Sequence, residues 1–127
     1  MKIFEEDIEI HPPGISDGFY KFLAILTALD QDASIVVIDE IENSLYAENL
    51  QYIIDELKHA ERPIVIATHS PTVVDLIDLE DLIIVEKTAE GSVLKRIKDV
   101  EKLKEKLHEQ GITYSESWLY GNFGDEV

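Results

Sequence analysis

Two apolar runs that end in polar residues decide the fold: IVVIDE at residues 35–40 and IVIATHS at residues 64–70. Both runs are rich in β-branched residues and are too short for helices, a pattern typical of strands buried on both faces of a parallel sheet. Each run closes in side chains that can do chemistry, Asp39 and Glu40 in the first and His69 in the second. We therefore expect both polar ends at one edge of the sheet, because ligands bind at the carboxyl ends of parallel strands.

Helical patterns separate these runs. Apolar residues recur at three- and four-residue spacing over residues 18–29 and again over residues 50–60. Ser16 and Asp17 are both suitable caps for the first helix. Ser70-Pro71 predicts the start of a short third helix, with proline in its first turn. Strands alternating with helices predict an α/β fold with three layers and a mainly parallel sheet.

The remaining sequence predicts further elements. Residues 82–85 predict a third buried strand, and residues 92–97 predict its hairpin partner. Residues 100–107 predict a charged helix stopped by Gly111. Residues 8–10 carry a weak strand pattern, and the HPPG stretch at 11–14 breaks regular structure. The aromatic tail, residues 117–123, has no clear period.

Composition limits the class of protein. A chain of 127 residues with 45% hydrophobic residues is expected to form one domain, over residues 1–127. Its net charge of −16 argues against direct nucleic-acid binding, since phosphate contacts need clustered Lys and Arg. Cysteine is absent, which excludes disulfides and thiolate metal sites. The acidic N-terminus is unlike a signal peptide, and no apolar run is long enough to span a bilayer. We expect a cytoplasmic chain without a membrane partner.

Asp39 and Glu40 are the first candidates for chemistry. A carboxylate at a strand end can hold Mg²⁺, which prefers hard oxygen ligands. The next side chain points the other way, so Glu40 can act on a water as a general base. Considered alone, the pair also fits an ordinary strand end that caps the following turn.

Three further groups have both a chemical and a structural interpretation. A neutral His69 can bind a phosphate oxygen or orient a water, or can be a histidine satisfied by backbone groups. Ser16 and Gly18 stand at a helix start, which attracts phosphate, although Asp17 opposes this and the segment also fits a simple cap. Asp75, Asp78 and Asp81 are spaced as helix and turn residues rather than as metal ligands.

The order of these features resembles the C-terminal half of ABC-type ATPase domains, closest to the RecF-like and SMC-like branch and to related AAA-type ATPases. Residues 15–19 (ISDGF) look like the signature motif, with Ser16 and Gly18 matching. Residues 35–39 resemble a Walker B strand. The resemblance implies that Asp39 holds Mg²⁺, Glu40 is the catalytic glutamate and His69 is the switch histidine. It likewise implies that Asn43 and Ser44 belong to the D-loop and, with Ser16 and Gly18, contact nucleotide across a dimer.

The sequence departs from that family in one large respect. A Walker A loop requires Gly-Lys-Ser/Thr, and none of the six glycines is followed by lysine. The adenine contacts and the Q-loop glutamine, which precede the signature motif in the family, have no counterpart here. The resemblance therefore implies a partial P-loop NTPase domain that binds ATP and Mg²⁺ only with a completing lobe.

Three functions remain open at this stage. The first is an ATPase half-domain completed by a Walker A lobe from another chain or from an absent segment, and we expect no measurable hydrolysis by the isolated chain. The second is a non-hydrolysing module that forms a homodimer or binds a partner through its exposed strand edge. The third, a Mg²⁺-dependent phosphatase-like domain using Asp39 and Glu40, lacks a nucleophilic aspartate with its companion motifs.

Overall fold

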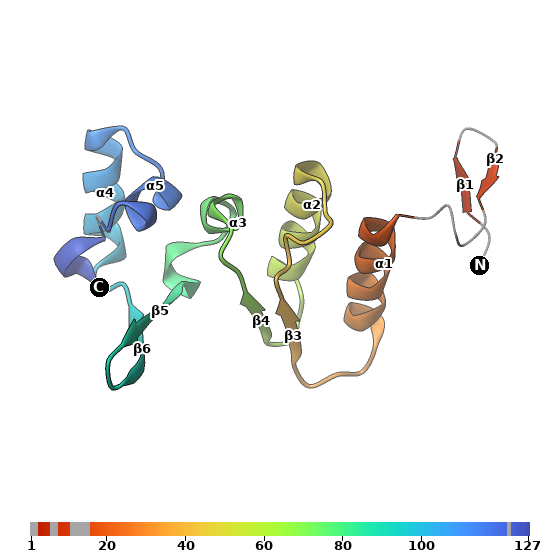
Figure 1. Cartoon of the computed structure of the whole chain (residues 1–127), viewed down its shortest axis with the longest axis horizontal. Coiled ribbons are helices and arrows are strands. Elements are labelled where there is room, and N and C mark those ends of the chain that lie inside the picture. Colours follow the sequence, from red (N-terminus) through yellow and green to blue (C-terminus); the bar gives the residue numbers. More distant parts are fainter. Residues whose placement is uncertain (1–2, 6–7, 11–15, 122) are drawn as a thin grey trace. The chain divides into compact units, whose positions relative to one another are not determined.

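The computed structural model describes residues 3–5, 8–10, 16–121 and 123–127 (Figure 1). The chain divides into two compact units, Met1–His69 and Ser70–Val127. The predicted break at residues 11–14 lies outside the described residues. Of the helices that the structure describes, none is long and apolar enough to cross a membrane.

The described residues of the first unit form two small sheets and two helices. Its elements are β1 (Ile3–Glu5), β2 (Ile8–Ile10), α1 (Asp17–Asp30), β3 (Val36–Asp39), α2 (Ala47–Lys58) and β4 (Ile64–Ala67). Strands β1 and β2 pair antiparallel, which confirms the weak strand pattern over residues 8–10. Strands β3 and β4 pair parallel and lie side by side in Figure 1, with α2 as their crossover helix. The predicted βαβ unit is thus confirmed.

Helix α1 begins where the sequence predicted. The Ser16 side chain accepts a hydrogen bond from the Phe19 backbone amide at 3.3 Å, so Ser16 rather than Asp17 is the cap. Lacking a side-chain cap, α2 buries four apolar residues instead: Leu50, Ile53, Ile54 and Leu57. Packing of one apolar face, more than capping, therefore stabilises α2.

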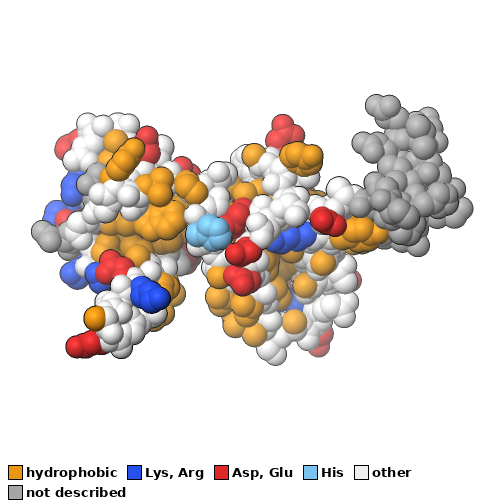
Figure 2. Space-filling view, viewed as in Figure 1, with side chains coloured by type: hydrophobic (Ala, Val, Ile, Leu, Met, Phe, Trp, Pro, Cys, Tyr) orange, Lys and Arg blue, Asp and Glu red, His pale blue; other side chains and the backbone are white. Residues whose placement is uncertain are grey.

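The β3–β4 sheet is buried on one face only. Val36 and Ile38 are buried, whereas Val37 is 67% exposed and Val65, its partner in register, is 48% exposed. The prediction of strands buried on both faces is wrong for this chain. Alternate side chains of a strand point to opposite faces, so the described residues cover one side of the sheet and leave the other apolar and open. Figure 2 shows hydrophobic side chains gathered over β3 and β4.

In the second unit, the described residues form helices and a hairpin. Its elements are α3 (Pro71–Leu76), η2 (Leu79–Asp81), β5 (Ile83–Thr88), β6 (Gly91–Arg96), α4 (Val100–Gln110), α5 (Tyr114–Leu119) and η3 (Gly124–Glu126). Pro71 stands at the start of α3, and Gly111 caps α4 with a φ of 66°. Both helix boundaries were predicted from these residues.

Strand β5 forms where predicted but is less buried than predicted. It pairs antiparallel with β6, as a hairpin partner would, and a two-residue turn joins them. A turn this short can connect only antiparallel strands. Ile83 and Val85 are exposed, so the prediction of a third buried strand is wrong. Among the described residues, parallel pairing is confined to β3–β4, and the fold is α/β with small parallel and antiparallel sheets.

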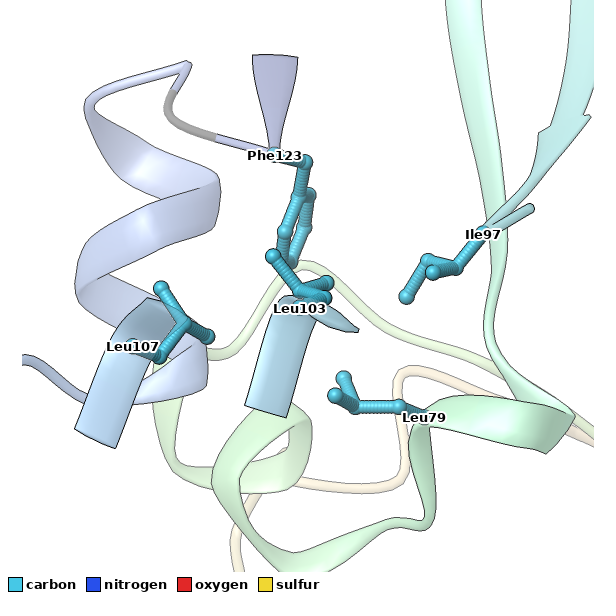
Figure 3. Packing of buried hydrophobic residues seen from close by; sticks show 5 residues of the cluster. All are labelled: Leu79, Ile97, Leu103, Leu107 and Phe123. Carbon is cyan, nitrogen blue, oxygen red and sulfur yellow. The ribbon is translucent and has the colours of Figure 1, made fainter. Parts of the chain in front are cut away.

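The core of the second unit forms around α4 and the end of the chain. Figure 3 shows five buried side chains converging from η2, the end of the hairpin, α4 and the tail: Leu79, Ile97, Leu103, Leu107 and Phe123. Trp118 of α5 packs against this cluster. The aromatic tail, which showed no period, thus contributes to the core of this unit.

Candidate functional site at the ends of β3 and β4

The two candidate strand ends lie next to each other. Asp39 stands opposite Ala67 in the parallel register, and the Glu40 backbone amide donates to the Ala67 carbonyl at 2.9 Å. Thr68 and His69 follow Ala67 directly. Parallel strands that end together deliver the residues after them to one edge. The predicted meeting of Asp39 and Glu40 with His69 at a single sheet edge is confirmed.

Glu40 is held from several directions. Its backbone has a φ of 46°, a left-handed conformation that non-glycine residues seldom adopt. Its carbonyl oxygen accepts hydrogen bonds from the Asn43 backbone amide at 3.0 Å and from Lys21 Nζ of α1. Its Oε2 accepts from Asn43 Nδ2 at 2.5 Å. These contacts orient one carboxylate oxygen and leave Oε1 without a partner among the described residues.

Asp39 is exposed, and its carboxylate makes no hydrogen bond or ion pair with any residue that the structure describes. No group of three or more His, Cys, Asp or Glu residues in the described part of the chain could hold a metal ion by itself. Asp75, Asp78 and Asp81 accordingly form no metal cluster. Magnesium typically needs only one or two carboxylates when substrate phosphates and waters supply its other ligands. Asp39 fits that role, but only in the presence of a phosphate ligand.

Glu42 joins the two strand ends. Its Oε2 accepts from the Thr68 hydroxyl at 2.8 Å, and its Oε1 accepts from the His69 backbone amide at 3.4 Å. Burial raises the pKa of Glu42. Hydrogen bonds lower it, and they come from the backbone amide of Glu42 itself, from the Thr68 hydroxyl and from the His69 amide. Together with the nearby His69 ring, these bonds outweigh burial and hold the pKa of Glu42 below its usual range. Glu42 is therefore ionised at neutral pH.

The His69 side chain projects from this edge. It is 76% exposed, and its Nδ1 lies 3.8 Å from Glu42 Oε1, whereas the Glu42 side chain is only 17% exposed. Figure 2 shows acidic side chains gathered beside a histidine on the face in view. A histidine with one nitrogen beside a carboxylate and the ring open to solvent can meet a ligand with its other nitrogen.

The other predicted residues lie around the start of α1. Ser16, Gly18 and Ser44 line a surface pocket of about 250 Å³, together with Phe19, Phe22, Tyr46 and Asn49. The Ser44 backbone is left-handed, with a φ of 64°. Its carbonyl approaches α1 so closely that a Cβ on Gly18 would lie 2.1 Å from the oxygen. Gly18 is thus required by packing, while Asn43 contacts Glu40 and does not line this pocket.

Sequence reasoning missed two residues of this edge, Glu42 and Lys21. Glu42 follows the Asp39-Glu40 pair by two residues, in a turn whose shape no periodicity reveals. Lys21 is the single basic residue of α1, which is otherwise apolar and acidic, and this isolation could have marked it as a contact to the site. Thr68, which follows β4 directly, also belongs to this edge, because its hydroxyl donates to Glu42 Oε2.

Comparison with solved structures identifies a similar fold. The chain matches a structure described as "Structural biochemistry of ATP-driven dimerization and DNA stimulated activation of SMC ATPases", with a TM-score of 0.61 and 19% sequence identity. The match covers 82% of this chain and 66% of the other, so this chain spans just under two thirds of that relative's length. No curated protein matches the chain.

Comparison with family models gives a match over residues 3–75, which is more than half of the chain and includes the signature-like segment, β3, the turn after it, β4 and His69. The model is described as an AAA domain, putative AbiEii toxin, type IV TA system. The motif order, the edge shared by β3 and β4, and this match agree, and the chain belongs to this AAA family of ABC-type ATPase domains.

Proposed function

We propose that this chain is the back half of an ATP-hydrolysing site, completed by a lobe that carries a Walker A loop. The observation that supports this most directly is the register of β3 and β4, which brings Asp39, Glu40 and His69 to one edge. Family membership implies nucleotide binding. The absence of any Gly-Lys pair in the sequence implies that the lysine for the β- and γ-phosphates comes from elsewhere.

Each residue has a distinct role in this proposal. Asp39 supplies an oxygen ligand to Mg²⁺, which when bound with ATP neutralises charge on the phosphates. Glu40, oriented by Asn43, accepts the proton of the attacking water through Oε1. His69 contacts the γ-phosphate. Ser16, Gly18, Asn43 and Ser44 face a second nucleotide across a dimer, in keeping with the dimerization named for the SMC relative.

The open face of the β3–β4 sheet supports the need for a completing lobe. Parallel sheets occur almost only with both faces covered, and here Val37 and Val65 are left exposed. We infer that the lobe covers this face and extends the sheet, which would produce the three-layer, mainly parallel architecture of a whole domain over the assembled chains. In this proposal the lobe carries a Gly-Lys-Ser/Thr loop, in another chain or in a segment outside residues 1–127, and residues 1–127 form one part of the domain.

The test is a mixing experiment. The chain alone should bind Mg·ATP weakly and show no turnover. Addition of a Walker A lobe encoded beside it should produce turnover, and Glu40→Gln should abolish that turnover without weakening ATP binding. Glu61→Gln, an exposed glutamate of the connector before β4, is the matched control and should behave like the unmodified protein. Clear turnover by the chain alone, or none with any such lobe, would contradict the proposal.

A second candidate is a non-hydrolysing dimerisation module, favoured by the same exposed apolar face. In that case two copies of this chain bury Val37 and Val65 against each other. Light scattering on the chain alone distinguishes the candidates. A dimer that Val37→Lys dissociates, and that no Walker A lobe displaces, would favour the module.

A further inference from the structure

We infer that Glu42 is a positioning residue of this site, which sets where His69 stands relative to Glu40. The inference rests on the proposed function and deepens it, because neither the motif comparison nor the family match assigns Glu42 a role. It concerns how the two strand ends are held together, rather than which groups meet the nucleotide.

The contacts of Glu42 point to both strand ends. It belongs to the turn at 40–44, and the neighbouring Ile41 anchors that turn because its side chain is fully buried. From this anchored turn its two oxygens reach the Thr68 hydroxyl, at 2.8 Å, and the His69 amide, at 3.4 Å. One carboxylate thus spans the segments that follow β3 and β4. Hydrogen bonds to a charged group are stronger than neutral ones, so this bridge restrains both segments.

The contacts of Glu42 hold the two segments together beyond the end of the β3–β4 ladder. The parallel ladder ends at the Asp39–Ala67 pair, and the Glu40 amide makes the last backbone bond to that strand. Beyond it, Glu42 links the two segments through the Thr68 hydroxyl and the His69 amide. Without these contacts, the His69 backbone would lose its link to the turn at 40–44, and packing restrains its side chain little because that side chain is 76% exposed.

The approach of Glu42 to the His69 ring also orients that ring. Glu42 Oε1 lies 3.8 Å from His69 Nδ1, on the side of the ring that faces the turn. The carboxylate stands beside Nδ1 and leaves Nε2 as the nitrogen open to a ligand. Glu42 therefore acts through His69 and does not itself meet the nucleotide.

The experiment has a spectroscopic arm on the full chain alone. Glu42→Ala should shift and broaden the amide and ring resonances of His69, with changes confined to residues 40–44 and 68–69. Glu42→Gln keeps one oxygen for the Thr68 hydroxyl and should give a smaller change, and Glu61→Gln should give none. Unchanged His69 resonances in Glu42→Ala would overturn the inference, whether or not the chain ever hydrolyses ATP.

The second arm uses the chain assembled with its Walker A lobe. Glu42→Ala should lower kcat roughly 10- to 100-fold with KM for ATP unchanged, since misplacing a reacting group by about an ångström can cost that much. Glu42→Gln should restore part of the loss. Combining Glu42→Ala with His69→Ala should cost no more than His69→Ala alone. Additive losses, or an unchanged kcat, would refute the positioning role. A shifted His69 without turnover in any assembly would instead refute only the proposed ATPase function.

Discussion

Gly18 shows how one hydrogen atom in place of a methyl group shapes the site. At an unobstructed helical position, alanine is more favourable than glycine by about 1 kcal/mol. At Gly18 the added Cβ would lie 2.1 Å from the Ser44 carbonyl oxygen, so the backbone at Ser44 must shift. If helix propensity dominates, Gly18→Ala should stabilise the chain, and if the contact with Ser44 dominates, it should destabilise the chain.

We predict that Gly18→Ala destabilises the chain by about 1–3 kcal/mol, the range for overpacking a tight contact. Urea unfolding measures the change. Ser34→Ala, in the exposed link after α1, is the control: it places an alanine outside this contact and should leave stability nearly unchanged. A stabilised Gly18→Ala variant would show that Ser44 does not hold its position against α1.

The stability of the fold should depend on pH through the Glu42 carboxylate. The folded chain holds the pKa of Glu42 below its ordinary value of 4.5, so this group stabilises the fold while it is ionised. The contribution is fully present above pH 4.5 and is lost as the pH falls through the lower folded pKa. Thr68→Val removes one bond that lowers the pKa and should raise the pKa of Glu42 towards 4.5.

Carbon-13 titration of the Glu42 carboxyl group checks this expectation. Thr72→Val, at an exposed position of α3, is the matched control and should leave the Glu42 titration unchanged. If Thr68→Val has no effect on the pKa of Glu42, the hydroxyl contact does not exist in solution.

At the scale of elements, the helices with regular apolar spacing were predictable and α5 was not. Helices α1 and α4 match their predicted ranges within a few residues, because spacing and end signals agreed. Helix α5 is six residues long, too short for a period to show. Its Thr113 and Glu116 nevertheless form a capping box, a local signal that spacing analysis passed over. The burial of β5 could not be predicted, since an apolar run looks alike in a buried strand and in an open hairpin.

Helix α5 also offers a matched pair of serines. Ser115 donates its backbone amide and its hydroxyl to the Asp75 carboxylate of α3, at 2.8 and 2.6 Å. Ser117 is fully buried, and its hydroxyl has no partner among the described residues. The same substitution should therefore have opposite consequences two residues apart.

We predict that Ser115→Ala destabilises the chain by about 1–3 kcal/mol, because it removes a hydrogen bond to a charged group. Ser117→Ala should be neutral or stabilising, because it removes a buried hydroxyl that bonds to nothing. Urea unfolding of the two variants side by side measures the difference. Equal losses in both would mean that Ser117 has a partner in solution.

At the scale of the whole molecule, charge opposes compactness. The net charge is −16 over 127 residues, and self-repulsion of that size destabilises a folded chain. Exposed ion pairs such as Lys95–Glu86, at 2.7 Å, typically contribute no more than about 1 kcal/mol each. Screening should therefore weaken the repulsion by more than it weakens these pairs.

We predict that raising NaCl from 10 to 300 mM increases the thermal midpoint, and a gain of about 1 kcal/mol corresponds to roughly 4 °C for a chain of this size. Differential scanning calorimetry measures the midpoint. Choline chloride at the same ionic strength should give the same increase, because screening does not depend on the cation. A midpoint that falls with salt would show that specific ion pairs outweigh the net repulsion.

The whole site was only partly accessible from sequence. The shared edge followed from two strand runs and their polar ends, since parallel strands obey a simple geometric rule. The bridge by Glu42 did not follow, because it depends on the path of a five-residue turn. A half-domain is expected to leave a strand edge or apolar patch open, but the position of that patch over Val37 and Val65 did not follow, because hydrophobicity reports what a residue can bury and not whether a neighbour is present.

The left-handed backbone at Glu40 has a consequence for how such a chain changes over time. A glycine would enter that conformation freely, whereas glutamate holds it at a cost of about 1 kcal/mol. Under the proposed function, position 40 is therefore a point where fold stability and a carboxylate at the strand end favour different residues. Replacing Glu40 with glycine should therefore relieve backbone strain and stabilise the turn, while removing the carboxylate from the strand end.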